Sequence, residues 1–175
     1  QLSKEALSAL MDVVVIQKIK KNGHVWKFGD PGEFCALVVE GLFCIIRPSG
    51  AENFNCMGVF GNGDMIGLSA LQKKIPFPGT AKLINDEGTV IKFYIRPLLQ
   101  NKTTSYHQEI NYLLREMTLL HEQILMEKID ITGAGGAEQR LIELLLHLTR
   151  RFGIFKSNIN VVIPIEIKKT DAANL

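Results

Sequence analysis

Short apolar segments alternate with polar, glycine-containing turns over most of the first half of the chain. From Val13 to about Ile95, each apolar segment has the length and residue types of a β-strand. Many short strands joined by such turns are typical of an all-β sandwich or barrel. The segments are VVVIQKI, HVWKF, FCALVVEG, LFCIIRP, NFNCMGVF, AKLI and TVIKFYI, and the turns include KNG, GDPGE, PSGAEN, GNGD and NDEG.

A helix is predicted ahead of these strands, where residues 3–16 open with a helix signal. Ser3 is a suitable N-cap, and Leu7, Leu10 and Met11 fall on one face of a helix that begins there. The strand-like pattern takes over at Val13, so this helix precedes the barrel.

Residues 103–132 have the pattern of one long helix, about 40 Å in length. The segment contains neither Gly nor Pro, and apolar residues recur in steps of three and four, with a break at Glu127. Further apolar residues lie off this heptad seam. The seam comprises Tyr106, Ile110, Leu113, Met117, Leu120, Ile124 and Ile131, and the off-seam set comprises Tyr112, Leu114, Leu119, Leu125 and Met126.

Two apolar sets on one helix predict two partners. We expect a second copy of the chain on the seam, with Ile110, Leu113, Met117, Leu120 and Ile124 at the dimer interface, and the chain's own β domain on the other side. The alternative is a single helix buried in one core, because a long helix need not dimerise.

The last part of the chain has the pattern of the front half of a further domain. The GAGG sequence at 133–136 ends the long helix and is expected to act as a hinge. A second helix follows and ends at Gly153, then a strand at 160–167 and the first turns of another helix at 168–175. One face of the second helix carries Leu141, Leu144, Leu145 and Leu148.

The composition is that of an ordinary globular protein. Hydrophobic residues make up 46% and charged residues 22% of 175 residues, and the net charge of +2 is too small to require an anionic partner. No apolar run approaches the ~20 residues that span a bilayer, so no membrane partner is expected. There is no signal peptide at the start, although the chain begins with Gln1.

Cysteine usage indicates a reducing compartment, and hence a cytoplasmic location. Cys35, Cys44 and Cys56 are odd in number and widely spaced, which argues against a disulfide framework and favours buried small hydrophobes. Neither the short Cys-x-x-Cys step of a zinc site nor the four thiolates of an iron–sulfur cluster is present, so no metal site is predicted.

The sequence does not predict an enzyme. It has no Gly-x-Ser-x-Gly, no His-Glu-x-x-His and no Walker loop. Asp30, Glu33 and Glu40 lie near turns, but no pair has a spacing that assigns one as an acid and the other as a base.

Three segments around the long helix together resemble the CRP/FNR family of bacterial transcription regulators. GHVWKFGDPGEFCALVVEGLFCII resembles the opening strands of the family's cyclic-nucleotide-binding β-roll. FGNGDMIGLSAL resembles the entry to its phosphate-binding cassette, and GGAEQRLIELLLHLTRRFG resembles the first helix of its DNA-binding domain. The resemblance implies an α+β protein with an N-terminal β-roll (jelly roll) over 1–102, a dimerisation helix over 103–132 and a partial winged helix-turn-helix over 133–175.

The resemblance also implies a function. The chain would be a homodimeric transcription regulator that binds a palindromic double-stranded DNA site, with RNA polymerase as a candidate further partner, under the control of a small effector bound between β-roll and long helix. The recognition helix would lie beyond Leu175. Lys168, Lys169 and Thr170 align with the start of the first helix of the motif, where a phosphate would be favoured. A solvated charge pair is the alternative for the two lysines.

The cassette departs from the pattern of the cyclic-nucleotide binders. Leu68 stands where they carry the glutamate that binds the ribose, and Gly79 stands where they carry the arginine that pairs with the phosphate. We therefore expect an effector other than cyclic AMP, and an apolar or planar one, because Leu125 and Met126 occupy the adenine-facing positions of the helix. The expected pocket comprises Gly67, Leu68, Ser69, Ala70, Gly79, Thr80, Ala81, His121 and Leu125.

Two further interpretations remain open at this stage. Some relatives hold haem in this cavity and sense diatomic gases or redox state, and the candidate axial ligands here are His121, Met65 and His107, each of which is also explained as a surface or hydrogen-bonded residue. The chain also resembles the stand-alone module of a kinase or channel, which would share the β-roll and lack the AEQRLIELLLHL helix after the hinge.

Overall fold

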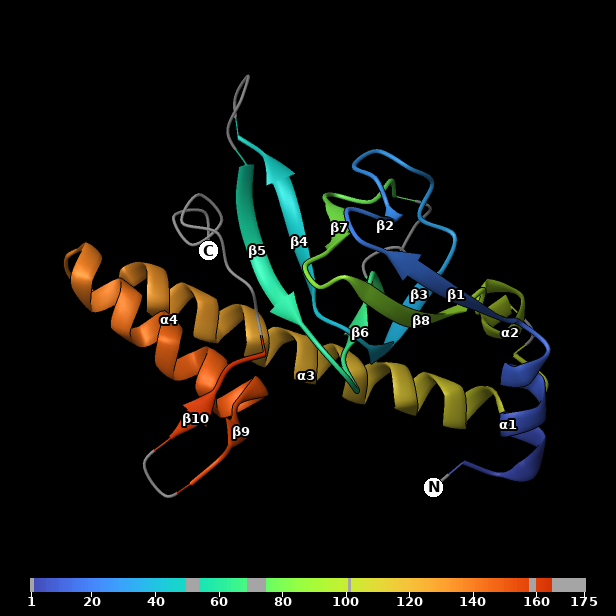
Figure 1. The fold of residues 1–175 in the computed structure, drawn as a ribbon. Coiled ribbons are helices and arrows are strands. Elements are labelled where there is room, and N and C mark those ends of the chain that lie inside the picture. Colours follow the sequence, from blue (N-terminus) through green and yellow to red (C-terminus); the bar gives the residue numbers. More distant parts are fainter. Residues whose placement is uncertain (1, 50–53, 69–74, 101, 158–159, 165–175) are drawn as a thin grey trace.

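Two four-stranded antiparallel sheets form the β-roll at the centre of the fold (Figure 1). The computed structural model describes residues 2–49, 54–68, 75–100, 102–157 and 160–164. One sheet has the order β1-β8-β3-β6, and the other has the order β2-β7-β4-β5. The strands are β1 (Val14–Lys20), β2 (His24–Trp26), β3 (Cys35–Glu40), β4 (Phe43–Pro48), β5 (Phe54–Phe60), β6 (Met65–Ile66), β7 (Thr80–Leu83) and β8 (Glu87–Phe93).

The strand predictions are confirmed for the seven apolar segments, and the α+β class with a jelly-roll-like domain is confirmed as well. Alternate residues of both sheets point inward, so Val38, Phe43, Phe60, Ile66 and Val90 are completely or almost completely buried between the sheets. The two-residue strand β6 was not predicted, because so short a segment has no periodicity to detect.

Helix α1 (Lys4–Met11) precedes the β-roll and ends five residues before the end of the predicted segment, since β1 begins at Val14. The predicted cap is confirmed: the Ser3 hydroxyl accepts a hydrogen bond from the Ala6 N–H at 3.2 Å. Of the three apolar residues placed on one face of this helix, Leu10 is buried together with Ala6, whereas Leu7 and Met11 are exposed.

Helix α3 (His107–Gly133) runs under the β-roll from one side of the molecule to the other (Figure 1). Its N-terminal half packs on α1 and on the short helix α2 (Arg96–Gln100). The Ser3 N–H also donates to the Glu109 carboxylate at 2.7 Å, which fastens the start of α1 to α3. The cluster formed here contains Leu10, Cys35, Leu68, Ile95, Leu98 and Ile110.

The predicted heptad seam of α3 is buried in part against its own chain. Ile110 is fully buried within its own chain and has no surface left for a partner. Leu113 and Met117 pack on the same cluster, and Ile124 packs on the core of the β-roll. The assignment of Ile110 to a dimer interface is therefore corrected. Leu113, Met117 and Ile124 are half-buried and Leu120 is exposed, so their place at such an interface stays a prediction. The exposed apolar residues of α3 are Tyr112, Leu119, Leu120, Met126 and Ile129.

After the glycines at 133–136, helix α4 (Ala137–Phe152) turns back along the C-terminal half of α3 (Figure 1). Leu144 and Leu148 pack with Ile131 of α3 and Val59 of β5, whereas Leu141 and Leu145, expected on the same face, are exposed. The helix ends at Gly153, as predicted, and leads into a hairpin of β9 (Ile154–Phe155) and β10 (Val161–Val162).

The cysteines are free thiols that behave as small apolar residues. Burial raises the pKa of Cys35 to about 12 and also raises the pKa of Cys56. Within the described ranges, no group of three metal-ligating side chains occurs and no helix is long and apolar enough to cross a membrane.

Candidate ligand-binding pocket

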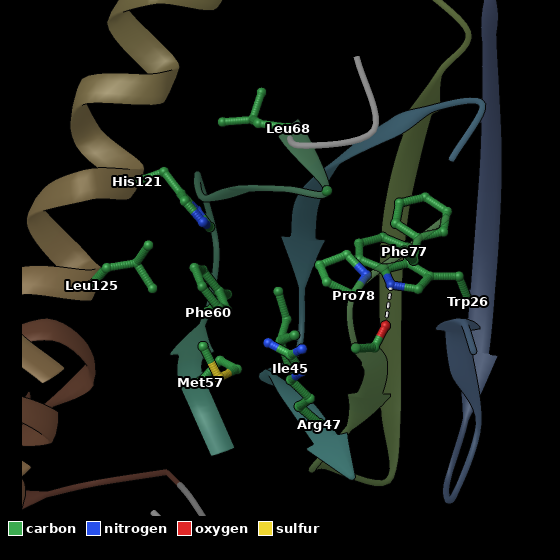
Figure 2. Close-up of a pocket in the computed structure, with 12 residues that line it drawn as sticks. Trp26, Ile45, Arg47, Met57, Phe60, Leu68, Phe77, Pro78, His121 and Leu125 are labelled. Carbon is green, nitrogen blue, oxygen red and sulfur yellow. Dashed lines mark hydrogen bonds between the residues drawn. The ribbon is translucent and has the colours of Figure 1, made fainter. Parts of the chain in front are cut away.

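A cavity of about 210 Å³ lies between the β-roll and helix α3 (Figure 2). Its walls come from segments that are far apart in the sequence. These are β2, β4, β5, the segment after β6, the segment before β7, and α3. The cavity is smaller than the ~300–1,000 Å³ of sites for drug-sized ligands. The lining residues are Trp26, Ile45, Arg47, Met57, Phe60, Gly67, Leu68, Phe77, Pro78, Gly79, His121 and Leu125.

A set of stacked aromatic rings forms one wall. Trp26 and Phe77 stack with centroids 4.2 Å apart and planes inclined by 13°, and Phe34 meets both rings edge-on from the core. The Trp26 indole N–H donates to the Gly79 carbonyl at 2.9 Å, shown by the dashed line in Figure 2. The bond satisfies the one polar atom of Trp26 and ties β2 to the segment that leads into β7.

The opposite wall joins the β-roll to the long helix through Phe60 and His121. Their rings stack at 5.3 Å with an interplanar angle of 10°. Burial lowers the pKa of His121, while the Met65 backbone and the charge of Asp64 act weakly in the opposite direction. The imidazole is therefore neutral near pH 7, and its buried Nδ1 has no hydrogen-bond partner among the described residues.

The described cassette positions 68 and 79 carry neither the carboxylate nor the guanidinium that would hold a cyclic nucleotide. Leu68 is buried and packs in the apolar cluster around Ile110, so the place of the expected carboxylate is occupied by hydrocarbon. Gly67 has a φ of +78°, and a side chain there would meet the Trp26 ring at 3.0 Å. At Gly79, a Cβ atom would lie 2.9 Å from both the Ile45 side chain and the Ile46 carbonyl oxygen. An arginine at position 79 has no room beside β4.

Five of the nine sequence-predicted pocket residues line the cavity: Gly67, Leu68, Gly79, His121 and Leu125.

Other predicted positions lie elsewhere. The Thr80 hydroxyl accepts a hydrogen bond from the Phe28 N–H at 2.9 Å, so it has a structural partner. Ala81 is fully buried in the core of the β-roll. Ser69, Ala70, Lys168, Lys169 and Thr170 lie outside the described residues.

Sequence reasoning missed Arg47. It lies on β4 two residues after Ile45, and both side chains line the cavity. Figure 2 shows the guanidinium of Arg47 beside Ile45, on the side of the strand where the other lining residues lie. The available signal was the strand LFCIIRP, in which residues 43, 45 and 47 share a face by alternation. An arginine on a face that is otherwise apolar is informative.

The candidate haem ligands do not converge on this cavity. Of the candidate axial ligands, only His121 lines the cavity. Met65 packs in the cluster around Ile110, and the His107 Nε2 lies 2.9 Å from the amide nitrogen of Asn111.

A polar contact joins α4 to the chain segment that contains Phe60, a residue that lines the pocket. The Arg151 guanidinium donates to the Val59 carbonyl at 2.7 Å and pairs with the Asp64 carboxylate at 2.5 Å. Asp64 also accepts from the Gly61 N–H at 2.7 Å, so the turn between β5 and β6 is held from both sides. We call this set of contacts the α4 latch. Phe60, which lines the cavity, lies between two residues of the latch.

A second polar contact joins α4 to α3. The His147 Nδ1 lies 2.8 Å from the Glu127 carboxylate. Burial lowers the pKa of His147, although Glu127 acts to raise it, so the neutral imidazole donates a hydrogen bond to the carboxylate near pH 7.

The chain is similar over most of its length to solved structures of bacterial regulators. FixK2 from Bradyrhizobium japonicum has a TM-score of 0.74 at 17% identity, covering 93% of this chain and 76% of that one. The c-di-GMP-responsive global regulator CLP of Xanthomonas campestris has a TM-score of 0.72 at 16% identity, covering 99% and 84%. A CRP-family transcriptional regulator from Thermus thermophilus has a TM-score of 0.72 at 12% identity, covering 90% and 75%.

No protein-family sequence model and no curated protein sequence matches the chain. The structural similarities show the fold: a cyclic-nucleotide-binding-type β-roll with the long helix of CRP-type regulators. The sequence resemblance to the CRP/FNR regulators is confirmed at the level of fold. The similar structures are transcription regulators and cyclic-nucleotide-binding domains, and nothing in them or in the described residues indicates catalysis.

Proposed function

We propose that this chain is the greater part of a DNA-binding transcription regulator of the CRP/FNR family, controlled by a small effector that is not cyclic AMP. The observation that carries the proposal is the combination in one chain of a cavity-bearing β-roll, a long helix that lines the cavity, and a further helix latched to the turn beside it. A kinase or channel module would account for the β-roll alone. It would not account for α4 and the β9–β10 hairpin, which are included in the similarity to CLP, since that similarity covers 99% of this chain.

The regions of the chain take three roles in this proposal. Residues 1–102 sense the effector, residues 103–132 pair two subunits, and residues 133–175 begin the DNA-binding domain. Lys168, Lys169 and Thr170 would approach the DNA backbone. An effector in the cavity would press on Phe60 and His121, and would thereby act on α3 directly and on α4 through the adjacent latch.

A second copy would pack on the exposed stripe of α3. Tyr112, Leu119 and Met126 follow one another at intervals of seven residues, and at 66%, 48% and 63% exposure they leave a large apolar area in water. Leu120 and Ile129 flank this stripe and are exposed as well. A charged side chain in the middle of such an interface would be buried unpaired, so Leu119→Asp would separate the subunits.

Exclusion of cyclic AMP rests on the packing at the cassette. The buried Leu68 offers no acceptor for a ribose hydroxyl, and the absence of room at Gly79 removes the usual position of the phosphate-binding arginine. Calorimetry with cyclic AMP is expected to give no stoichiometric binding, and tight binding would contradict this part of the proposal.

The experiment that tests the function uses the full-length protein as the cell makes it. Repeated selection from random duplex DNA should enrich a two-fold symmetric site, and sedimentation should give a dimer that Leu119→Asp converts to a monomer. Gln139→Asp, on the exposed surface of α4, is a control for an added negative charge. Enrichment of no sequence, together with a monomeric wild type, would overturn the proposal.

A further inference from the structure

Arg47 is the one formally charged side chain among the twelve described residues that line the cavity. Within the described part of the chain, its guanidinium has neither an ion-pair nor a hydrogen-bond partner. A guanidinium remains protonated at any physiological pH and presents a planar set of donors that matches a carboxylate. In Figure 2, these nitrogens lie beside Ile45 between Met57 and Pro78, at the exposed end of the cavity.

The other lining residues that the structure describes provide no competing charge. The walls are aromatic rings, aliphatic side chains and glycines, apart from His121, which burial keeps neutral. A ligand that filled this space would meet hydrocarbon on most sides and a single cation at one end. The best match is a molecule with an apolar body and one negative group, because only such a molecule satisfies both parts of the surface.

The position of the cation differs from the one that the cassette would predict. Position 79 has no room for a side chain, because its Cβ would collide with Ile45 and Ile46 of β4. Arg47 instead approaches from β4 itself, two residues further along that strand. An anion held by Arg47 would lie at the end of the cavity remote from Leu68, with its apolar body directed toward Trp26 and Leu125.

We propose that the cavity binds small apolar carboxylates, with Arg47 pairing with the carboxylate and the aromatic wall of Trp26 and Phe77 covering the hydrocarbon. The proposal deepens the proposed function and rests on it only in calling this cavity the effector site. A cavity of about 210 Å³, below the ~300–1,000 Å³ of sites for drug-sized ligands, suits a small acid.

The chain contains its own reporter for this binding. Trp26 is the single tryptophan of the sequence, and it lines the cavity, so its fluorescence reports occupancy directly. The probes are phenylacetate and its neutral isostere phenylacetamide, with hexanoate and hexanamide as an aliphatic pair. The variants are Arg47→Gln, which removes the charge, and Arg47→Lys, which keeps the charge and loses the planar fork. Arg140→Gln, on the exposed surface of α4, is the matched control.

We expect each acid to bind at least about tenfold more tightly than its amide, since a charge-assisted pair adds roughly that much. Arg47→Gln should remove the advantage of the acid and leave the affinity for the amide unchanged. Arg47→Lys should retain part of the advantage, Arg140→Gln should retain all of it, and added salt should reduce it because Arg47 is exposed to solvent.

Equal affinity for acid and amide, an acid preference that survives Arg47→Gln, or no binding of either acid at millimolar concentration would overturn the inference. Far-UV circular dichroism on each variant shows that a lost preference is not a lost fold. The DNA selection described above fails or succeeds independently. Arg47-dependent acid binding without any selected DNA site would leave this inference standing and overturn the regulator proposal, and the reverse result would do the opposite.

Discussion

The two halves of helix α3 are held in the molecule by different kinds of contact. The N-terminal half packs against α1 and α2 mainly through apolar side chains, among them the fully buried Ile110, with one hydrogen bond from the Ser3 N–H to Glu109. The C-terminal half has a smaller apolar contact with α4 around Ile131, supplemented by the His147–Glu127 contact and by the α4 latch. The cavity lies between them, where His121 and Leu125 line it.

This difference indicates which part of the molecule is suited to move. Apolar burial changes little with pH or salt, whereas contacts between polar and charged groups respond to both and to a nearby ligand. The elements that move in regulation are drawn from the less stable parts of a protein. Here α4, the first helix of the proposed DNA-binding domain, is fastened in part by contacts that can be switched, and the N-terminal half of α3 is a fixed support.

The largest expected effect comes from the fixed support. Ile110→Ala should lower the free energy of unfolding by about 2–5 kcal/mol, because it leaves a cavity in a site with no exposure. Leu7→Ala, on the exposed side of α1, should change it by less than about 0.5 kcal/mol. Denaturant titrations of both variants measure the contrast. If the two losses are equal, the N-terminal half of α3 is not the apolar anchor described here.

A smaller effect is expected at the α4 latch. Asp64→Asn removes the ion pair between Asp64 and Arg151, whose side chains are 19% and 17% exposed respectively. The variant should lower the free energy of unfolding by about 1–3 kcal/mol. In a double-mutant cycle with Arg151→Gln, the coupling between the two positions should be about 1–2 kcal/mol.

The matched control for the latch is an exposed ion pair of similar chemistry. Lys21 and Asp86 lie 2.6 Å apart, but their side chains are 62% and 74% exposed. Solvent screens such a pair, so Asp86→Asn should have little effect. A coupling energy between Asp64 and Arg151 no greater than that between Lys21 and Asp86 would show that the ion pair does not hold α4 in place.

The smallest effect is a pH dependence confined to the C-terminal half. Burial holds the pKa of His147 below its ordinary value of 6.5, so the unfolded chain binds a proton more readily than the folded one. The free energy of unfolding is therefore not reduced by His147 above pH 6.5, and it declines as the pH falls below that value. His121 acts in the same direction for the same reason.

The measurement for this effect is the pH dependence of unfolding followed by a probe on α4. His147→Gln should make the decline below the ordinary histidine pKa shallower. A decline that is identical in the wild type and in His147→Gln would assign the pH dependence to other groups.

The sequence predicts the strands and helices well because each has its own period and its own turn residues. The strand segments between Val13 and Ile95, the Ser3 cap and the end of α4 at Gly153 are all local patterns. The partner of each face of α3 was not predictable in this way. Two apolar stripes at helical spacing look alike in a single sequence, and only the fold decides that Ile110 is covered by α1 and α2 while Tyr112 is exposed.

The site was predictable where a motif marks it and not where long-range packing builds it. Gly67, Leu68 and Gly79 follow from the cassette-like order of residues, and His121 and Leu125 follow from counting along the helix. Arg47 and Trp26 come from strands far away in the sequence, and no local signal joins them to the cassette. The α4 latch joins residues 87 positions apart, so it could be found only in three dimensions.

Native-state hydrogen exchange of the wild type and of Asp64→Asn tests the central claim most directly. The account predicts that the amides of α4 exchange through a local opening of lower free energy than the amides around Ile110. It also predicts that Asp64→Asn accelerates exchange in α4 alone. If α4 and the N-terminal half of α3 exchange with the same free energy, and Asp64→Asn accelerates both equally, the molecule opens as one unit and α4 is not a separately released element.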